Sequence, residues 1–151
     1  MIAARLWWDD GAQAAVEAGE PTHVFAAGPD VAEAIRLALR HPDLVLSLVL
    51  ADPIATHVDV MASLPDVAVP TLVVASAPSG DSDLTVAQRF AGDIDNAVFV
   101  VVDGSARPVH TASRASFTEW SSSFVAIAEG LAAREGRHLT PPTPLVEGAL
   151  R

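Results

Sequence analysis

The side chains that could exchange protons with a substrate lie in two segments of the chain. Asp81 and Asp83 flank Ser82 just before a predicted helix, and His110 lies further along in a predicted loop. A carboxylate and an imidazole at one end of a sheet can act as an acid/base pair. The same aspartates can instead cap the following helix, and a loop histidine is often only solvated. Both interpretations stay open from the residues alone.

A short apolar run at residues 24–27 has strand length and ends at a glycine. Gly28 permits a tight turn, Pro29 suits the first position of a helix, and Asp30 adds a carboxylate to its first turn. These residues predict a sharp turn from a strand into a helix. All three are candidates for ligand contact at that turn.

The next elements follow without a gap. Apolar residues repeat at helical spacing over residues 31–40, and Pro42 ends the helix. Residues 44–51 are almost uniformly apolar, as expected for a strand buried on both faces of a parallel sheet. Asp52 and His57 follow this strand at the edge where ligands bind in such sheets, which makes them further candidates for ligand contact.

This unit resembles the nucleophile elbow of α/β hydrolases, where G-x-S-x-G-G precedes a helix ending in R-H-P and a strand ending in L-V-L-x-D-P. Residues 40–42 and 48–53 match the last two motifs. The resemblance puts the first glycine of the elbow at Ala26, its serine at Gly28 and its second glycine at Asp30. Glycine has no side chain that can attack an acyl carbon, so the elbow chemistry cannot run from this position.

The resemblance continues along the second half of the chain. Residues 69–75 resemble the strand whose end carries the catalytic acid, and residues 86–94 resemble the helix that follows. An ungapped count places the acid near Ser79, with Asp81 and Asp83 a few residues further on. A shift of one or two residues would restore an aspartate.

The strand at residues 97–102 precedes a segment that resembles the loop carrying the catalytic histidine. The count places that histidine at Arg107, and His110 lies three residues later. An arginine stays protonated and cannot act as a base, but it can hold a carboxylate or phosphate group of a ligand. Residues 117–135 resemble the last helix of the fold.

The resemblance covers roughly residues 7–135 and implies an α/β fold. We expect a small, mostly parallel sheet of about four strands flanked by helices, like the C-terminal half of an α/β hydrolase. Before the elbow strand there is room for one helix at residues 6–18, and residues 53–67 are too short for a lid. Trp7 and Trp8 are adjacent on that expected helix, so one should pack inward and the other against a partner. Residues 136–151 contain Pro141, Pro142 and Pro144 and are expected to form an extended tail.

Composition excludes several classes of function. The chain has 151 residues, 50% of them hydrophobic, and a net charge of −10, which argues against nucleic-acid and anionic-membrane surfaces. It has no cysteine, no signal-peptide core and no run of membrane-spanning length. We expect a cytoplasmic protein without a metal or a cofactor.

A sheet that begins at residues 24–27 would leave the outer edge of this strand without a neighbour. Unpaired edge groups beside apolar side chains favour pairing with another strand. We expect a homodimer, formed either through these edges or through the helices around Trp7 and Trp8. The tail, with Leu145, Val146 and Leu150, is the alternative cover.

Three classes of function remain. The first is a non-hydrolytic protein that binds a small apolar ligand or a protein partner at the open end of the sheet. The alternative is an enzyme with relocated acid/base chemistry, such as a cyclase, lyase, isomerase or atypical hydrolase of specialised metabolism, using Asp81 or Asp83 with His110. The third is a structural subunit or a decaying fragment. A carboxylate within hydrogen-bond reach of His110, beside an apolar pocket, would favour the enzyme.

Overall fold

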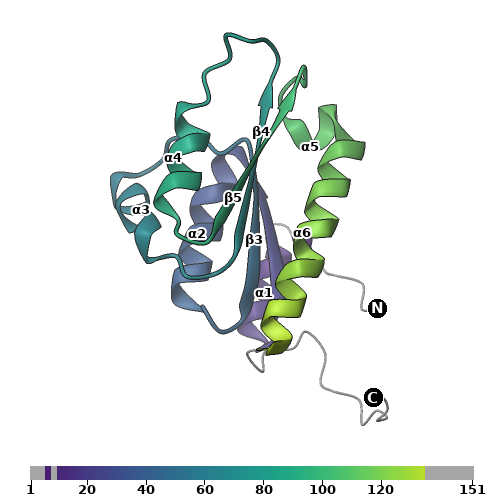
Figure 1. The fold of residues 1–151 in the computed structure, drawn as a ribbon. Helices are drawn as coiled ribbons and strands as arrows, with labels where there is room; N and C mark the ends of the chain where they lie inside the picture. Colours follow the sequence, from purple (N-terminus) through teal and green to yellow (C-terminus); the bar gives the residue numbers. More distant parts are fainter. Residues whose placement is uncertain (1–5, 8–9, 135–151) are drawn as a thin grey trace.

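The computed structural model describes residues 6–7 and 10–134 of the chain. They form an α/β fold in which helices pack on a sheet of five parallel strands (Figure 1). The strands lie side by side in the order in which they occur along the chain. They are β1 (Leu6–Trp7), β2 (Thr22–Ala27), β3 (Val45–Ala51), β4 (Thr71–Ala77) and β5 (Ala97–Asp103).

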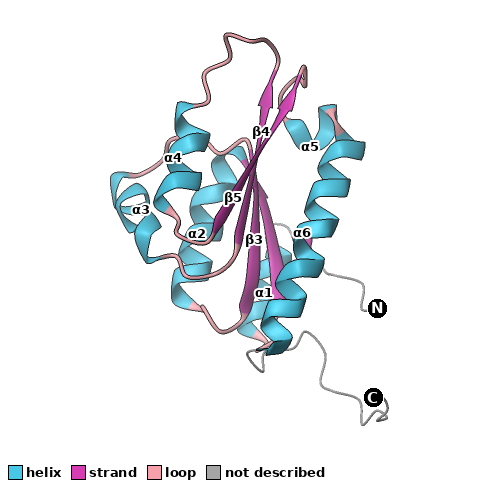
Figure 2. Cartoon of the chain, in the orientation of Figure 1, coloured by secondary structure: helices cyan, strands magenta, loops and turns pink. Residues whose placement is uncertain are grey.

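Helices cover both faces of this sheet (Figure 2). They are α1 (Asp10–Glu17), α2 (Val31–Arg40), α3 (Val58–Ser63), α4 (Thr85–Asp93), α5 (Val109–Ala112) and α6 (Arg114–Arg134), with 3-10 turns η1 (Gly28–Asp30) and η2 (Leu64–Asp66). Each strand from β2 to β5 lies beside the strand that precedes it in the chain, always in the same direction across the sheet. Because such crossovers are right-handed, their helices fall on one face, and α5 and α6 are left to cover the other.

Two apolar clusters result, one on each face. The first joins the sheet to α2, α3 and α4 and contains Val16 of α1, Ile35 and Phe90. The second joins it to α5 and α6 and contains Phe25 and Phe117. Every residue of β2, β3 and β4 is buried. This burial on both faces explains why these strands are so uniformly apolar.

The expected α/β class and the parallel sheet flanked by helices are confirmed. The helix expected at residues 31–40 has those bounds as α2, and the elbow strand, the next two strands and the last helix lie where the sequence predicts them. The connection at residues 53–67 is short, as expected, but it contains α3 and η2.

One expectation is wrong at the start of the chain. Residues 6–18 do not form a single helix, because Leu6–Trp7 forms β1 and the helix begins only at Asp10. Leu6 pairs with His23 and Trp7 with Val24, so the amino half of β2 has a neighbouring strand. The expectation that the outer edge of β2 has no neighbouring strand is therefore wrong for its amino half. Trp7 is a strand residue, and Trp8 and the tail at residues 136–151 lie outside the described residues.

Among the described residues, no helix combines the length and the hydropathy needed to cross a bilayer.

Candidate functional site

The turn between β2 and α2 has the geometry of an elbow without a nucleophile. Gly28 has φ +55°, in the left-handed region, and stands between the last residue of β2 and Pro29. The N–H of Val31 donates to the carbonyl of Gly28, which closes η1. A Cβ added at Gly28 would meet no atom within 4 Å, so the space above the turn is open. Pro29 and Asp30 are exposed, and Asp30 makes no side-chain cap bond to α2.

Asp52 links three segments at the carboxyl end of the sheet. Its Oδ1 accepts hydrogen bonds from the Ser76 N–H (2.8 Å) and from Ser76 Oγ (2.9 Å), and its Oδ2 accepts one from the Val109 N–H (2.8 Å). The residue holds a left-handed backbone with φ +44°. The carboxylate thus fastens β4 and α5 to the end of β3. The sequence predicts Asp52 only as a ligand contact and gives no signal for this structural role.

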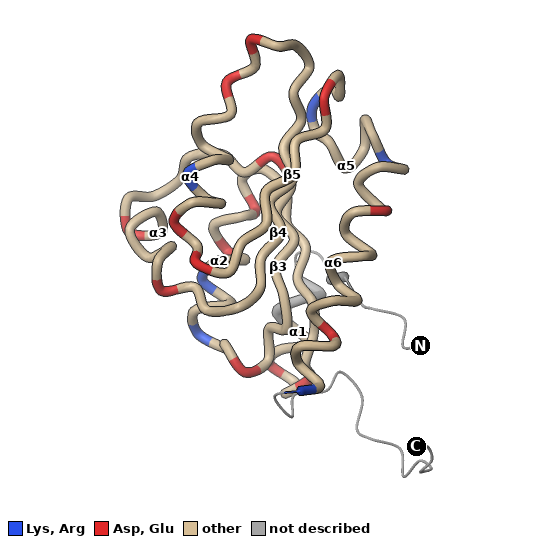
Figure 3. The backbone as a smooth tube through the Cα atoms, viewed as in Figure 1, with Lys and Arg blue, Asp and Glu red and all other residues tan. Residues whose placement is uncertain are grey.

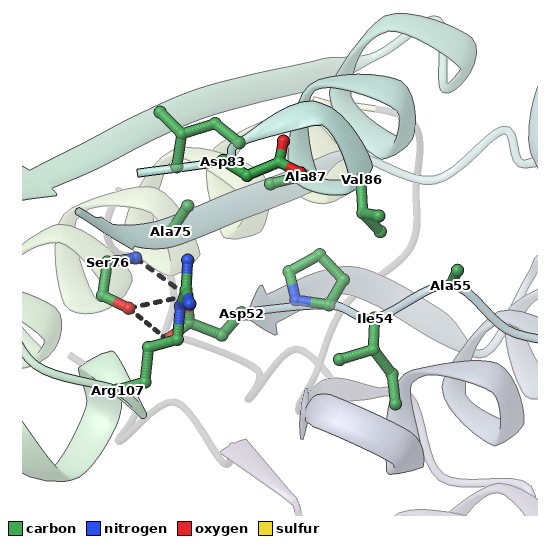
Figure 4. Close-up of a pocket in the computed structure, with 11 residues that line it drawn as sticks. Asp52, Ile54, Ala55, Ala75, Ser76, Asp83, Val86, Ala87 and Arg107 are labelled. Carbon is green, nitrogen blue, oxygen red and sulfur yellow. Dashed lines mark hydrogen bonds between the residues drawn. The ribbon is translucent and has the colours of Figure 1, made fainter. Parts of the chain in front are cut away.

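A pocket of about 310 Å³ opens beside Asp52 at the carboxyl ends of β3 and β4 (Figure 4). Its polar groups come from Asp52, Ser76, Asp83 and Arg107. Ala75 forms part of its wall, together with Pro53, Ile54, Ala55, Leu84, Val86 and Ala87. The pocket lining is therefore mostly apolar with a few polar groups, which is the usual composition of a small-molecule site.

Asp83 is engaged with the start of α4. Its Oδ1 accepts a hydrogen bond from the Thr85 N–H at 2.9 Å. The hydrogen bonds from the side chain and then the backbone of Thr85 hold the pKa of Asp83 below its usual value, and the nearby charge of Arg107 adds a smaller effect in the same direction. This i to i+2 hydrogen bond is an Asx turn that leads into α4, whose N-cap residue is Leu84. Asp81 is exposed in the preceding loop.

His110 lies on the short helix α5, although the sequence predicts a loop. Its ring packs edge-to-face against Phe25, with centroids 5.4 Å apart, and against Phe117, with centroids 6.1 Å apart. Burial lowers the pKa of His110, and the charge of Asp52 offsets part of this effect. Phe25 and Phe117 belong to the cluster beneath α6, whereas the pocket wall residues Ala75 and Ala87 belong to the other cluster.

The expected pairing of Asp83 with His110 is therefore not what the geometry favours. The carboxylate of Asp83 is directed to Thr85 at the pocket rim, and the imidazole packs against Phe25 and Phe117 of the cluster beneath α6. Two other candidates are also held locally. Ser79 forms an exposed turn in which its N–H donates to Ser82 Oγ at 3.0 Å, and the Nδ1 of exposed His57 lies 3.3 Å from Arg36 Nη2.

Sequence reasoning missed a buried polar cluster at the other end of the sheet. Nδ1 of His23 lies 2.7 Å from Ser47 Oγ, and its Nε2 lies 2.7 Å from Glu129 Oε2. Both His23 and Ser47 have 0% exposure. The available signal is a histidine near the start of the mostly apolar β2 and a single serine within the apolar β3. Because Ser47 is fully enclosed, this Ser-His-Glu arrangement presents no nucleophile to a substrate.

Comparison with solved structures identifies the fold. A CIB-like hydrolase from Thermoplasma acidophilum superposes with a TM-score of 0.63 at 18% identity, over 72% of this chain and 52% of that one. A serine hydrolase of carbazole degradation, the CarC enzyme, gives 0.61 at 14%, over 72% and 64%. Proline iminopeptidase from Mycobacterium smegmatis gives 0.65 at 13%, over 80% and 70%.

The chain has the α/β-hydrolase fold. The part of it that superposes spans about half of the Thermoplasma hydrolase and about two thirds of the CarC enzyme. Sequence identities this low show that the fold is shared, but they do not show a shared activity. The sequence matches no family model and no curated protein.

Proposed function

We propose that this domain binds a small molecule with an apolar body and one anionic group in the pocket beside Asp52, and does not hydrolyse it. The observation that carries the proposal is a pocket of about 310 Å³ with an arginine at its rim, next to an elbow whose nucleophile position is Gly28. Ligand sites in proteins span about 300–1,000 Å³, so the volume suits a small ligand.

The pocket wall favours an apolar ligand body. Ile54, one of its wall residues, leaves 48% of its surface exposed. A large exposed apolar side chain beside a concavity is typical of a binding surface, because a ligand removes that area from water. The neighbouring wall residues Leu84 and Val86 are half-buried and extend the same surface along α4.

Arg107 supports an anionic group on the ligand. The structure gives it no ion pair within residues 6–7 and 10–134. The two carboxylates in the pocket are already engaged, Asp52 with Ser76 and Val109, and Asp83 with Thr85. A guanidinium can bind a carboxylate or phosphate through two parallel hydrogen bonds. A ligand carboxylate at the rim of the pocket could therefore form an ion pair with the guanidinium of Arg107.

The same geometry argues against hydrolysis. Gly28 supplies no nucleophile, and Ser76, the serine that lines the pocket, is fully buried with its hydroxyl directed to Asp52. The ring of His110 packs edge-to-face against Phe25 and Phe117, which belong to the cluster beneath α6. A bound ester would thus find no activated hydroxyl beside a base.

A matched pair of probes tests binding. Octanoate and octan-1-ol share an alkyl chain and differ in charge, and amide NMR shifts report where each one binds. We expect octanoate to perturb Ala75, Ala87 and Arg107 and to bind about tenfold more tightly than the alcohol, equivalent to about 1.4 kcal/mol. Arg107→Leu should remove this preference, and Arg114→Leu, an exposed arginine on α6, should retain it. Ala87→Phe fills the pocket and should abolish binding of both probes.

Two results would contradict the proposal. In the first, octanoate leaves the amides of the pocket unperturbed. In the second, 4-nitrophenyl butyrate is hydrolysed above the buffer rate and His110→Ala or Ser79→Ala removes that turnover, which would restore a catalytic site.

A further inference from the structure

The outer edge of β5 is open among the described residues. β5 is the last strand of the sheet and pairs on one side with β4. Its residues are half-buried or exposed although residues 97–102 are all apolar, and Val98 is 48% exposed. Natural edge strands are usually protected by charges, prolines or bulges. Residues 97–102 have none of these, and in Figure 3 the tube is tan along most of β5, which ends at Asp103.

The face of β5 on the α6 side continues this apolar surface. Val100 and Val102 pack against the cluster that contains Phe117 and Phe124 of α6, and Val98 is on the same side of the strand. At 100° per residue, Trp120 and Ile127 lie roughly 160–180° around α6 from Glu129. Glu129 contacts His23 of β2. Trp120 and Ile127 are on the opposite side of α6 from Glu129, and we therefore place them on the side of the helix toward β5. They are 48% and 63% exposed.

We propose that this surface, Val98, Val100, Val102, Trp120 and Ile127, together with the β5 edge, binds a second copy of the chain about a two-fold axis. Each copy carries a net charge of −10, so a contact between two copies must keep charged side chains from its centre, and the five side chains named here carry no charge. A two-fold axis also pairs an open edge with an identical one, which satisfies its backbone groups. The outer edge of β2 has fewer unpaired backbone groups for such a contact, since β1 pairs with its amino half.

The backbone pattern fixes the register of the pairing. The carbonyl of Asn96 accepts from Thr71 and the N–H of Gly104 donates to Ala77, so even-numbered residues of β5 direct their backbone groups to β4. Odd-numbered residues therefore direct theirs outward. An antiparallel pair centred on Val100 puts Phe99 opposite Val101 and Ala97 opposite Asp103, as hydrogen-bonded pairs.

Other centres are less favourable. Moving the axis to residue 99 puts Asp95 opposite Asp103, and like charges directly opposed are destabilising. The Val100 register avoids this and uses the whole strand. It also leaves the α6 helices of both copies on one face of a continuous sheet, flanking the exposed valines.

A single cysteine tests this register, because the chain has none of its own. In the proposed pair Val100 faces Val100 of the second copy with Cα atoms about 4.5 Å apart, within the range of a disulfide. Val98 faces Val102 instead, which leaves the two copies of Val98 roughly 13 Å apart along the strands. We expect oxidised Val100→Cys to form a covalent dimer almost completely and Val98→Cys to stay uncrosslinked.

Sedimentation of the wild-type chain provides the second measurement. We expect a dimer at micromolar concentration. Val98→Lys should raise its dissociation constant by about 100-fold or more, because two buried charges would face apolar strands. The control Val58→Lys, at a position 85% exposed on α3, should leave it unchanged. A wild-type monomer, or crosslinking of Val98→Cys as readily as Val100→Cys, would overturn the proposal.

Discussion

Nε2 of His23 lies 2.7 Å from Oε2 of Glu129, so a histidine with no exposed surface joins β2 to α6. The other ring nitrogen lies 2.7 Å from the hydroxyl of Ser47 on β3. With the proton on Nε2, the ring donates to the carboxylate and accepts from the serine. The tautomer is assigned from these partners. A neutral ring satisfies both contacts, and this makes the cluster sensitive to pH.

The first prediction is that the domain loses stability as the pH falls below neutral. Burial lowers the pKa of His23, and the hydrogen bond and charge of Glu129 offset part of this effect. The unfolded chain therefore binds more protons than the folded one below the ordinary histidine pKa of 6.5. The stabilising contribution is complete above that value and is lost as the pH falls toward the lower folded pKa. Urea unfolding at several pH values between about 7.5 and 5 measures it.

Matched variants separate His23 from the other titrating groups. Burial lowers the pKa of His110 too, so part of the pH dependence should persist in any variant at position 23. We expect His23→Gln to reduce the slope of unfolding free energy against pH, and His57→Gln, at an exposed site, to leave it unchanged. Equal slopes in His23→Gln and the wild type would exclude His23 as the source.

The second prediction concerns the carboxylate that fastens the end of the sheet. Asp52→Ala would leave the N–H groups of Ser76 and Val109 without their acceptor, and it would place alanine at φ +44°. We expect a loss of about 2–4 kcal/mol in the free energy of unfolding, since unsatisfied buried donors cost about 1–3 kcal/mol each. Asp52→Asn should lose less, because asparagine tolerates the left-handed region.

Asp43→Ala is the control for this prediction. Asp43 is an exposed residue before β3, and its replacement should change the unfolding free energy by less than about 0.5 kcal/mol. If Asp52→Ala behaved like this control, Asp52 would not fasten the three segments as inferred.

The regular elements could be predicted because their signals are local. Residues 31–40 combine a helical repeat of apolar positions with a proline beyond the end, and α2 has those bounds. Parallel strands that are buried on both faces have continuous apolar sequences, and this pattern predicts β3. Each signal lies within a single stretch of about ten residues and does not depend on distant contacts.

The missed features depend on contacts between distant residues. β1 is only two residues long, and its strand character comes from pairing with His23 and Val24. Asp52 bonds to Ser76 and Val109, which lie 24 and 57 residues away in sequence. Such partners are set by the packing of strands rather than by local pattern, so the local pattern predicts Asp52 only as a ligand contact at a strand end.

The third prediction concerns the elbow itself. Gly28→Ser would restore a hydroxyl at the position where α/β hydrolases carry their nucleophile. There is room for it, since an added Cβ meets no atom within 4 Å, but the φ of +55° should cost about 1–2 kcal/mol of unfolding free energy. Gly28→Ala carries the same backbone cost without the hydroxyl, so comparing the two isolates any chemistry from strain.

We expect no ester hydrolysis from Gly28→Ser above the rate of Gly28→Ala, with 4-nitrophenyl butyrate as substrate. A serine hydroxyl needs a base that accepts its proton, and that base needs an orienting acid. The position that the resemblance gives to the histidine holds Arg107, and the ring of His110 packs against Phe25 and Phe117. Turnover by Gly28→Ser that disappears in the double variant with His110→Ala would show that His110 reaches the elbow. In that case the site would lack only its nucleophile.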